Sequence, residues 1–419
     1  MPSVTPVLSP AKFHCENAMT ENPANSKLTF PTETDYSNRV ERARAAMKQN
    51  GLDVLALSSF DNHRFFTGLD GIASVRPIWF VLPQGGSPAF ISPRIEAPEI
   101  RSQCTVPVAV EWVEWEEPAK TPMSFSAALA RHVGEIAPKA RTIGVDFDAT
   151  SARSLDLVRD ALGADRIRDV TDILREVRRR KDQATIDVVR RSADIAAYQF
   201  KASRDAVKPG VPEWKVALAS RTAAMERAAE WWNGDENHSP LLQGIHVMGC
   251  GSIRSGRAHA VAAGRPMREG EVVQLCYCGR PFFGHGICFD RPLKVGSEPV
   301  TDDLRKIVDV ARKAQEAALA KVRAGVTTGE VHAAAVAVIE GHGYGGAMQH
   351  RTGRGIGLSD PEFPEIKAND PTVLEAGMLL GIEPGVYVDG VGGARFGDTI
   401  LVTETGYEPL TPLELGRHI

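Results

Sequence analysis

The chain has 419 residues, 43% of them hydrophobic and 24% charged, and its formal net charge is -4. These values are typical of globular proteins, and the length predicts two or three domains with a large core. The sequence has no basic run that indicates nucleic-acid binding and no apolar run long enough to cross a bilayer. We therefore expect neither nucleic acid nor a membrane among its partners.

The cysteines and the first residues of the chain indicate its compartment. Six cysteines are spread without the regular spacing of a disulfide framework. The stretch MPSVTPVLSPAKFHCEN lacks the charged start, apolar run and cleavage site of a secretory signal. Because disulfides persist mainly in oxidising compartments, we expect a cytoplasmic protein with reduced thiols.

The first third of the chain alternates helix and strand patterns, as an α/β domain does. Residues 1–29 are rich in Pro, Ser, Thr and Asn without a period and predict a loosely ordered arm. Thr34 or Ser37 can cap the first helix, which ends near Gly51. Strands are predicted at 52–57, 78–82 and 89–91, followed by a strand that leads into a helix within RTIGVDFDATSARSLDLVRDAL. The N-terminal domain is expected to span residues 30–172.

Residues 173–419 repeat one arrangement, a helix pair followed by strands. The segment VRAGVTTGEVHAAAVAVIEGHG resembles AVKPGVPEWKVALASRTAAMER, and each contains the second helix of a pair. Helices are predicted at 181–207, 212–230, 301–323 and 329–341, and strands at 244–252, 272–277, 285–291, 349–358, 378–388 and 398–402. Two helix pairs packed over a curved antiparallel sheet would bring both halves to one cleft. We expect His259, Asp290, His350, Arg354 and Glu383 to meet there.

Acid–base chemistry is suggested by a histidine on a Gly-rich segment near a strand-borne carboxylate, His259 and Asp290. The alternative is an ordinary surface histidine and a structural ion-pair partner. For Glu383 the alternative is a purely structural ion pair with Arg354, and for His350 a hydrogen bond within the sheet.

Three motifs then carry a resemblance to a known family. They are GRGIGL at 353–358, EAGMLLGIEPGVYV at 375–388 and GGARFGDTILVTETGYEPLT at 392–411. These segments resemble the strands of the pita-bread family, which includes creatinase, prolidase, aminopeptidase P and methionine aminopeptidase. The resemblance implies an α/β (α+β) fold, with a creatinase-like N-terminal domain and a C-terminal pita-bread domain.

The family's metallopeptidases hold two metal ions with two Asp, one His and two Glu, and the resemblance places these ligands here. The positions fall on Cys276 or Tyr277, Cys288, Arg354, Glu383 and Gly397. Only Glu383 keeps a ligand side chain, and a permanent positive charge on Arg354 would repel two dications. We therefore expect no metal and no other cofactor.

The cysteines themselves could form another kind of metal site. Cys276 and Cys278 are expected to point to opposite faces of their strand and so not to enter one cleft together. A soft zinc site of Cys288, one of these two and His285 is one alternative. Small apolar packing is the favoured role.

Creatinase is the family member whose pattern tolerates these losses. RAHAV at 257–261 resembles its catalytic-histidine loop, which makes His259 the proton shuttle. CFDR at 288–291 and GIEPG at 381–385 resemble its two substrate-binding segments, so Asp290 and Glu383 would hold a guanidinium. VRP at 75–77 resembles a segment that binds the substrate carboxylate across a dimer interface, which implies a homodimer and a role for Arg76. Arg76 could also be an ordinary surface arginine.

Two further arginines near the cleft complete the predicted site. Arg351 and Arg354 lie on or beside the strand that faces it and could bind the substrate carboxylate, with His350 beside them.

The sequence therefore predicts a creatinase-like, metal-independent hydrolase that cleaves a C–N bond, amidino or amide, in a small carboxylate-bearing nitrogen compound. One alternative is a metallopeptidase of the X-Pro dipeptidase or aminopeptidase P type, and another is an inactive pita-bread module that binds peptides or proteins. A metallopeptidase would lose activity to a chelator, whereas an inactive module would be indifferent to His259→Ala in every assay. The creatinase-like hydrolase would lose activity on His259→Ala and keep it with a chelator.

Overall fold

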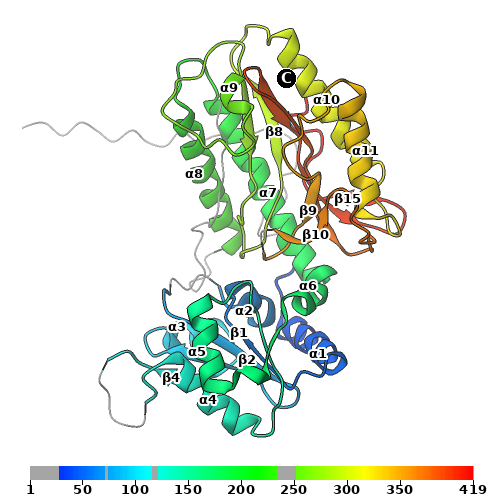
Figure 1. Ribbon diagram of the computed structural model, residues 1–419. Helices are drawn as coiled ribbons and strands as arrows, with labels where there is room; N and C mark the ends of the chain where they lie inside the picture. The colour runs from blue at the N-terminus through cyan, green and yellow to red at the C-terminus, as the bar shows by residue number, and fades with distance from the viewer. Residues whose placement is uncertain (1–27, 71–73, 116–120, 234–251, 360, 419) are drawn as a thin grey trace, which may run out of the picture.

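The computed structural model describes residues 28–70, 74–115, 121–233, 252–359 and 361–418. A domain built on one six-stranded sheet lies below a domain in which strands stand between two helix pairs (Figure 1). This arrangement confirms the predicted mixed α/β fold. The expected N-terminal arm, except for its last two residues, and most of the strand predicted at 244–252 lie outside the described residues.

The N-terminal sheet is mixed, with the order β4-β3-β2-β1-β5-β6. Alternate residues of β1 enter two different hydrophobic clusters: Leu55 and Leu57 enter one, Val54 and Ala56 the other. The sheet is therefore covered on both faces, as its nearly all-apolar central strands require. Its strands are β1 (Val54–Leu57), β2 (Trp79–Pro83), β3 (Ala89–Pro93), β4 (Val108–Trp112), β5 (Ile143–Val145) and β6 (Ile167–Asp169). Its helices are α1 (Glu33–Gln49), α2 (Phe60–Thr67), α3 (Ala97–Gln103), α4 (Phe125–Ile136), α5 (Ala152–Leu162) and α6 (Thr171–Arg179).

The first helix begins earlier than predicted. Thr32, and neither Thr34 nor Ser37, is the N-cap: its hydroxyl accepts from the backbone N–H of Asp35. The Asp35 carboxylate in turn accepts from the Thr32 backbone N–H at 2.8 Å. This reciprocal capping box satisfies two N–H groups at once, which a single cap residue inside the first turn cannot do.

The second domain contains the two predicted helix pairs. They are α7 (Gln183–Ala206) with α8 (Glu213–Trp232), and α10 (Asp302–Leu319) with α11 (Thr328–Gly341); α9 (Ser252–Ser255) is a single turn. Asp182 caps α7, and Thr327 forms a capping box with Glu330 at α11. Figure 1 shows the two pairs on opposite sides of the strands.

The strands of this domain form one five-stranded antiparallel sheet, β10-β9-β11-β14-β15, and two separate pairs, β7-β8 and β12-β13. Their bounds are β7 (Val272–Cys276), β8 (Asp290–Lys294), β9 (Gly353–Gly355), β10 (Glu362–Ile366), β11 (Leu379–Ile382), β12 (Gly385–Val388), β13 (Gly392–Arg395), β14 (Asp398–Val402) and β15 (Tyr407–Pro409). The strand predicted at 285–291 begins only at Asp290, because Gly286 bonds to Gly357 and Cys288 to Thr399 instead of to a ladder partner.

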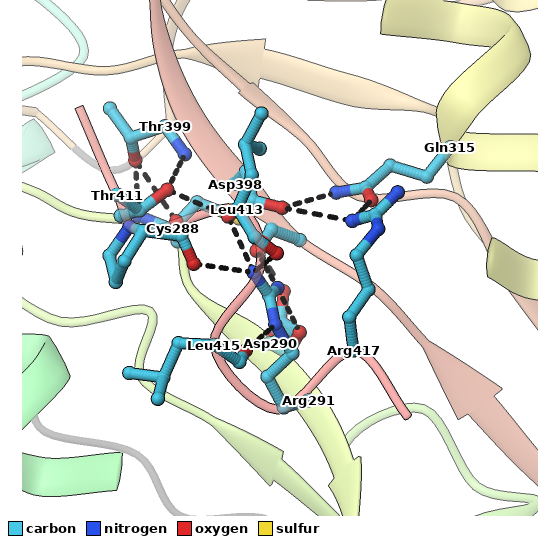
Figure 2. A network of polar contacts seen from close by, with 12 residues as sticks. Cys288, Asp290, Arg291, Gln315, Asp398, Thr399, Thr411, Leu413, Leu415 and Arg417 are labelled. Atoms are coloured by element: carbon cyan, nitrogen blue, oxygen red, sulfur yellow. Dashed lines mark hydrogen bonds and ion pairs between the residues drawn. The ribbon is translucent and has the colours of Figure 1, made fainter. Parts of the chain in front are cut away.

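A buried ion pair joins β8 to β14 behind the strand ends. Arg291 and Asp398 are both fully buried and lie 2.8 Å apart. Figure 2 shows their further partners: Arg291 donates to the backbone carbonyls of Leu413 and Leu415, and Asp398 accepts from Gln315. Each charge is thus hydrogen-bonded as well as paired, which is what burial of charges requires.

Among the described residues, no helix has both the length and the apolar character needed to span a bilayer.

Candidate active site

Four side chains with metal-type or acid–base chemistry meet where β7 and β11 end and β8 begins. Cys278 follows β7, Cys288 precedes β8, Asp290 is the first residue of β8, and Glu383 follows β11. Their ligand atoms lie within 4.8 Å of one another, and all but Cys278 are buried. Pairing of β7 with β8 sets Cys276 opposite Asp290, which brings the end of one strand to the beginning of the next. We call these four residues the strand-end cluster.

Each carboxylate of the cluster is paired with a buried arginine. Asp290 Oδ1 accepts from Arg395 at 3.0 Å, and Glu383 Oε1 accepts from Arg354. The two ion pairs make the centre of the site nearly neutral. Burial raises the pKa of Asp290 to about 7 although Arg395 lowers it, because desolvation disfavours the charged carboxylate.

The thiols of Cys278 and Cys288 both contact the two carboxylates. Cys288 Sγ lies 3.4 Å from Asp290 Oδ2 and 3.3 Å from Glu383 Oε2, and Cys278 Sγ lies 3.7 Å from Glu383 Oε2. The cysteines are therefore part of the polar site as well as of the core. A hydrogen bond from Cys276 lowers the pKa of Cys278, and burial raises the pKa of Cys288.

The expectation that Cys276 and Cys278 point to opposite faces is wrong. The two thiols contact each other, and this contact raises the pKa of Cys276. Residues two apart on an extended chain share a face, since side chains alternate with a period of two. Both thiols therefore turn toward Asp290.

His350 is half-buried and uses both ring nitrogens. Nδ1 lies 2.8 Å from the carbonyl oxygen of Arg351, and Nε2 lies 2.8 Å from the hydroxyl of Tyr387. Burial, with the nearby charge of Arg395, lowers the pKa of His350. The ring is thus neutral at neutral pH, with Nδ1–H donating to the carbonyl and Nε2 accepting from the tyrosine.

His259 lies near His350 but is exposed. Its segment is held by the side-chain amide of Gln349, which donates to the Gly256 carbonyl at 3.4 Å, and by Ser255, which accepts from Gly393 N–H. The proximity of His259 contributes to the lowered pKa of His350. Of the five residues expected in the cleft, Asp290 and Glu383 belong to the cluster, Arg354 pairs with Glu383, and His350 lies near Arg395, Glu383 and His259.

Two predicted substrate arginines lie away from the cluster. Arg76 stands in the N-terminal domain, where its Nε donates to Glu114 at 2.7 Å. Arg351 pairs with Glu365 at 3.4 Å. The role of Arg76 in a partner's site stays a prediction.

The five-ligand, two-metal arrangement implied by the resemblance does not fit these side chains. Arg354 occupies the ligand position beside Glu383 with a guanidinium, which cannot ligate a metal. A Cβ added at Gly397 would overlap Asp290 Oδ2, so the aspartate fills the space that a glutamate there would need. The structure does not place His285 with the cysteines as the zinc alternative requires. Among the described residues, the group of potential metal ligands does not include His285, whose Nδ1 lies 2.6 Å from the carbonyl oxygen of Phe283.

Sequence reasoning missed Arg395 and Tyr387 and undervalued the thiols. Arg395 lies 105 positions from Asp290 along the chain, so no local spacing reveals the pair. One signal could have identified Arg395. A buried Asp and a buried Glu each need a positively charged partner, and the motif GGARFGD contains one arginine, Arg395.

A small, partly open cavity lies at the junction of the two domains. Arg42, Arg178, Lys181, His285 and Glu362 are among its lining residues, and none of the cluster residues is. Lys181 and Glu362 form a buried ion pair of 2.6 Å in its wall. The cavity therefore belongs to the domain junction and not to the chemistry of the strand ends.

Two known families match the chain. Residues 39–180 match the creatinase/prolidase N-terminal domain, and residues 187–404 match metallopeptidase family M24. The structure of an Xaa-Pro dipeptidase from Bacillus anthracis superposes with a TM-score of 0.77 at 25% identity, covering 91% of this chain and 99% of that one. Dipeptidase PepE from Mycobacterium ulcerans gives a TM-score of 0.76 at 29% identity, covering 92% and 97%. These likenesses confirm the pita-bread resemblance.

Curated relatives span both peptidases and a cyclase. The agropine synthesis cyclase of Rhizobium rhizogenes is 53% identical over 390 residues, which are 93% of this chain and 98% of the relative. The Xaa-Pro dipeptidase of Pyrococcus furiosus is 25% identical over 376 residues, 90% of this chain and 98% of the relative. Fold, length and sequence agree over almost the whole chain: it is a member of metallopeptidase family M24.

Proposed function

We propose that this chain is a metal-independent M24 enzyme that closes a ring within one small, carboxylate-bearing nitrogen compound. The observation that carries the metal independence is the pairing of both cluster carboxylates with buried arginines, Asp290 with Arg395 and Glu383 with Arg354. Support for ring closure is the 53% identity to a relative named as a cyclase.

Ring closure and peptide hydrolysis share their chemistry at a carbonyl carbon. In hydrolysis, water attacks the carbon and an amine leaves with a proton. In ring closure, a group of the same molecule attacks, its proton passes to a base, and water or an amine leaves after receiving a proton. The difference lies in which nucleophile reaches the carbon, so a site that excludes water favours the internal one.

The proposed roles follow the geometry. His259, which is exposed, exchanges protons with the reacting groups, and the neutral His350–Tyr387 pair lies near it. Arg395 contributes a donor, because its Nε is buried without a hydrogen-bond partner among the described residues. That N–H can bind a substrate oxygen, while Asp290 and Glu383 accept from the substrate nitrogen.

Hydrolysis of a C–N bond is the second proposed function, supported by the dipeptidase relatives. An amide fits the charge balance better than a guanidinium here. A cationic substrate would enter a site in which Arg354 and Arg395 already neutralise both carboxylates, and would leave excess positive charge in a buried space.

Arg76 and the dimer belong to the same proposal. Arg76 is half-buried on the N-terminal domain, and among the described residues its guanidinium pairs with Glu114, which is half-exposed. In a homodimer its guanidinium would reach the partner's site and bind the substrate carboxylate, as the likeness to creatinase implies.

Mass spectrometry of reaction products tests the reaction class. The purified chain is incubated with a panel of N-substituted amino acids that can close a ring, N-acyl amino acids, guanidino acids and X-Pro dipeptides. Ring closure removes one water or an amine from the substrate, and hydrolysis adds one water. We expect a ring product with the first group, and its loss in His259→Ala.

The matched control is His342→Ala, which changes another exposed histidine, at the end of α11. It should keep full activity. Products from X-Pro dipeptides alone would contradict the proposal and favour a peptidase. No product from any panel member, with no difference between the two variants, would favour an inactive binding module.

A further inference from the structure

The strand-end cluster has the spacing of a single tetrahedral metal site. Tetrahedral zinc, with Zn–S bonds of about 2.3 Å and Zn–O bonds of about 2.0 to 2.2 Å, holds sulfur and oxygen ligands about 3.5 Å apart. The four sulfur–oxygen separations from Cys278 and Cys288 to Asp290 Oδ2 and Glu383 Oε2 are 3.8, 3.7, 3.4 and 3.3 Å. The donors therefore stand close to where one ion would need them.

The charges of the cluster are compatible with one zinc-type ion bound by thiolates but not with the two metal ions of the peptidases. Asp290 and Glu383 are already neutralised by Arg395 and Arg354. Zinc binds cysteines as thiolates, so Cys278 and Cys288 would offset its two positive charges. A second dication would have no compensating ligand in the cluster.

The two arginines hold the carboxylates in the orientation that a metal needs. Arg395 takes Asp290 Oδ1 and leaves Oδ2 toward Cys288, while Cys278 lies 3.7 and 3.8 Å from the two oxygens. Arg354 takes Glu383 Oε1 and leaves Oε2 toward both thiols. Hydrogen bonds to the outer oxygen of a ligating carboxylate are what fixes ligands in known metal sites. Neither ion pair has to break when the ion binds.

The backbone around the cluster is also fixed before any ion arrives. Cys288 N–H donates to the Thr399 hydroxyl at 2.8 Å, and the same hydroxyl donates to the Cys288 carbonyl at 3.0 Å. Asp290 exchanges both backbone hydrogen bonds with Gly397. Cys278 is the partly exposed member and gives an ion a route of entry.

We propose that Cys278, Cys288, Asp290 and Glu383 bind one zinc-type ion, and that this ion inhibits the enzyme by occupying the carboxylate oxygens that face the substrate. The binding part stands on geometry alone. The inhibitory part rests on the proposed function, in which the reaction needs no metal.

Cobalt(II) is the probe, because its absorption reports thiolate ligation and tetrahedral geometry. The full chain, reduced and freed of metal, is titrated with Co²⁺, and Zn²⁺ is then added in competition. We expect one Co²⁺ per chain, thiolate-to-cobalt charge-transfer bands and displacement by Zn²⁺. Cys278→Ser and Cys288→Ser should each weaken binding by at least about tenfold. Cys104→Ser, which changes a partly exposed thiol of the N-terminal domain, should bind like the parent.

A second readout uses the unaltered chain. Zinc should protect Cys278, the partly exposed thiol of the cluster, from alkylation and leave Cys104 as reactive as before. Cobalt bands without thiolate character, or equal binding by the Ser variants and the parent, would overturn the site. Activity that zinc lowers and a chelator restores supports the inhibitory part, and activity unchanged at full occupancy overturns it. Activity that requires zinc would overturn the proposed function while leaving the metal site standing.

Discussion

At the scale of single residues, Arg395 and Asp290 each depend on the other for a buried partner of opposite charge. Both side chains are buried, so Arg395→Gln leaves an uncompensated carboxylate and should cost about 3–5 kcal/mol of unfolding free energy. Adding Asp290→Asn removes that charge and should recover part of the loss. Urea denaturation of both single variants and the double variant measures the coupling as a double-mutant cycle. Additive losses would mean that the pair is not the stabilising interaction described.

Residue chemistry could be predicted from sequence only in part. The motif around Glu383 marked it as a site residue, and its partner Arg354 was foreseen because both lie in recognisable segments. Cys288 was taken as filler, since its contact with Glu383 joins residues 95 positions apart. Contacts of this kind are set by how strands meet in space, which no local pattern encodes.

At the scale of secondary structure elements, the buried pair of Arg291 and Asp398 fixes β8 to β14 and so positions Asp290. Arg291→Met should cost about 3–5 kcal/mol, because Asp398 would keep a buried charge with only neutral donors and Arg417 at 3.9 Å. Arg305→Ala is the control: its exposed pair with Asp302 should be worth less than about 1 kcal/mol. Equal losses in chemical denaturation would contradict the assigned role.

Helices were easier to predict than strands. The bounds of α7, α8 and α11 agree with the sequence prediction within two residues, because a 3.6-residue period marks them and side-chain caps start α7 and α11. The segment before Asp290 was predicted as strand and is instead irregular, held by single bonds from Gly286 and Cys288. The apolar residues of this segment are explained by its burial, and a buried segment need not form the regular hydrogen bonds of a β-strand. The domain boundary near residue 172 stays a prediction.

At the scale of the whole molecule, buried histidines make stability depend on pH. Burial lowers the pKa of His63 to about 4, so its ring stays neutral in the folded chain while the unfolded chain binds a proton below about 6.5. The contribution of the neutral His63 ring to the unfolding free energy is fully present above pH 6.5. It falls by about 1.4 kcal/mol per pH unit as the pH drops from 6.5 toward 4. His63→Gln should flatten the slope by that amount in denaturation at several pH values. An unchanged slope would contradict the assignment.

The proposed dimer predicts recovery of activity when two inactive variants are mixed. If Arg76 serves the partner's site, a mixed dimer of Arg76→Ala and His259→Ala chains has one intact site. Half of randomly reassorted dimers are mixed, so about a quarter of the original activity should return after unfolding and refolding together. No recovery would show that Arg76 does not act across the interface.

The central claim is that this M24 enzyme works without the metal pair of the peptidases. The most direct test is the activity of the chain after exhaustive chelation, with metal content measured in the same sample and the ring product followed by mass spectrometry. We predict full turnover in metal-free protein, with no stimulation by Mn²⁺ or Co²⁺, because Arg354 and Arg395 supply the positive charge beside both carboxylates. Loss of turnover on chelation, restored by adding one of these ions, would contradict the account.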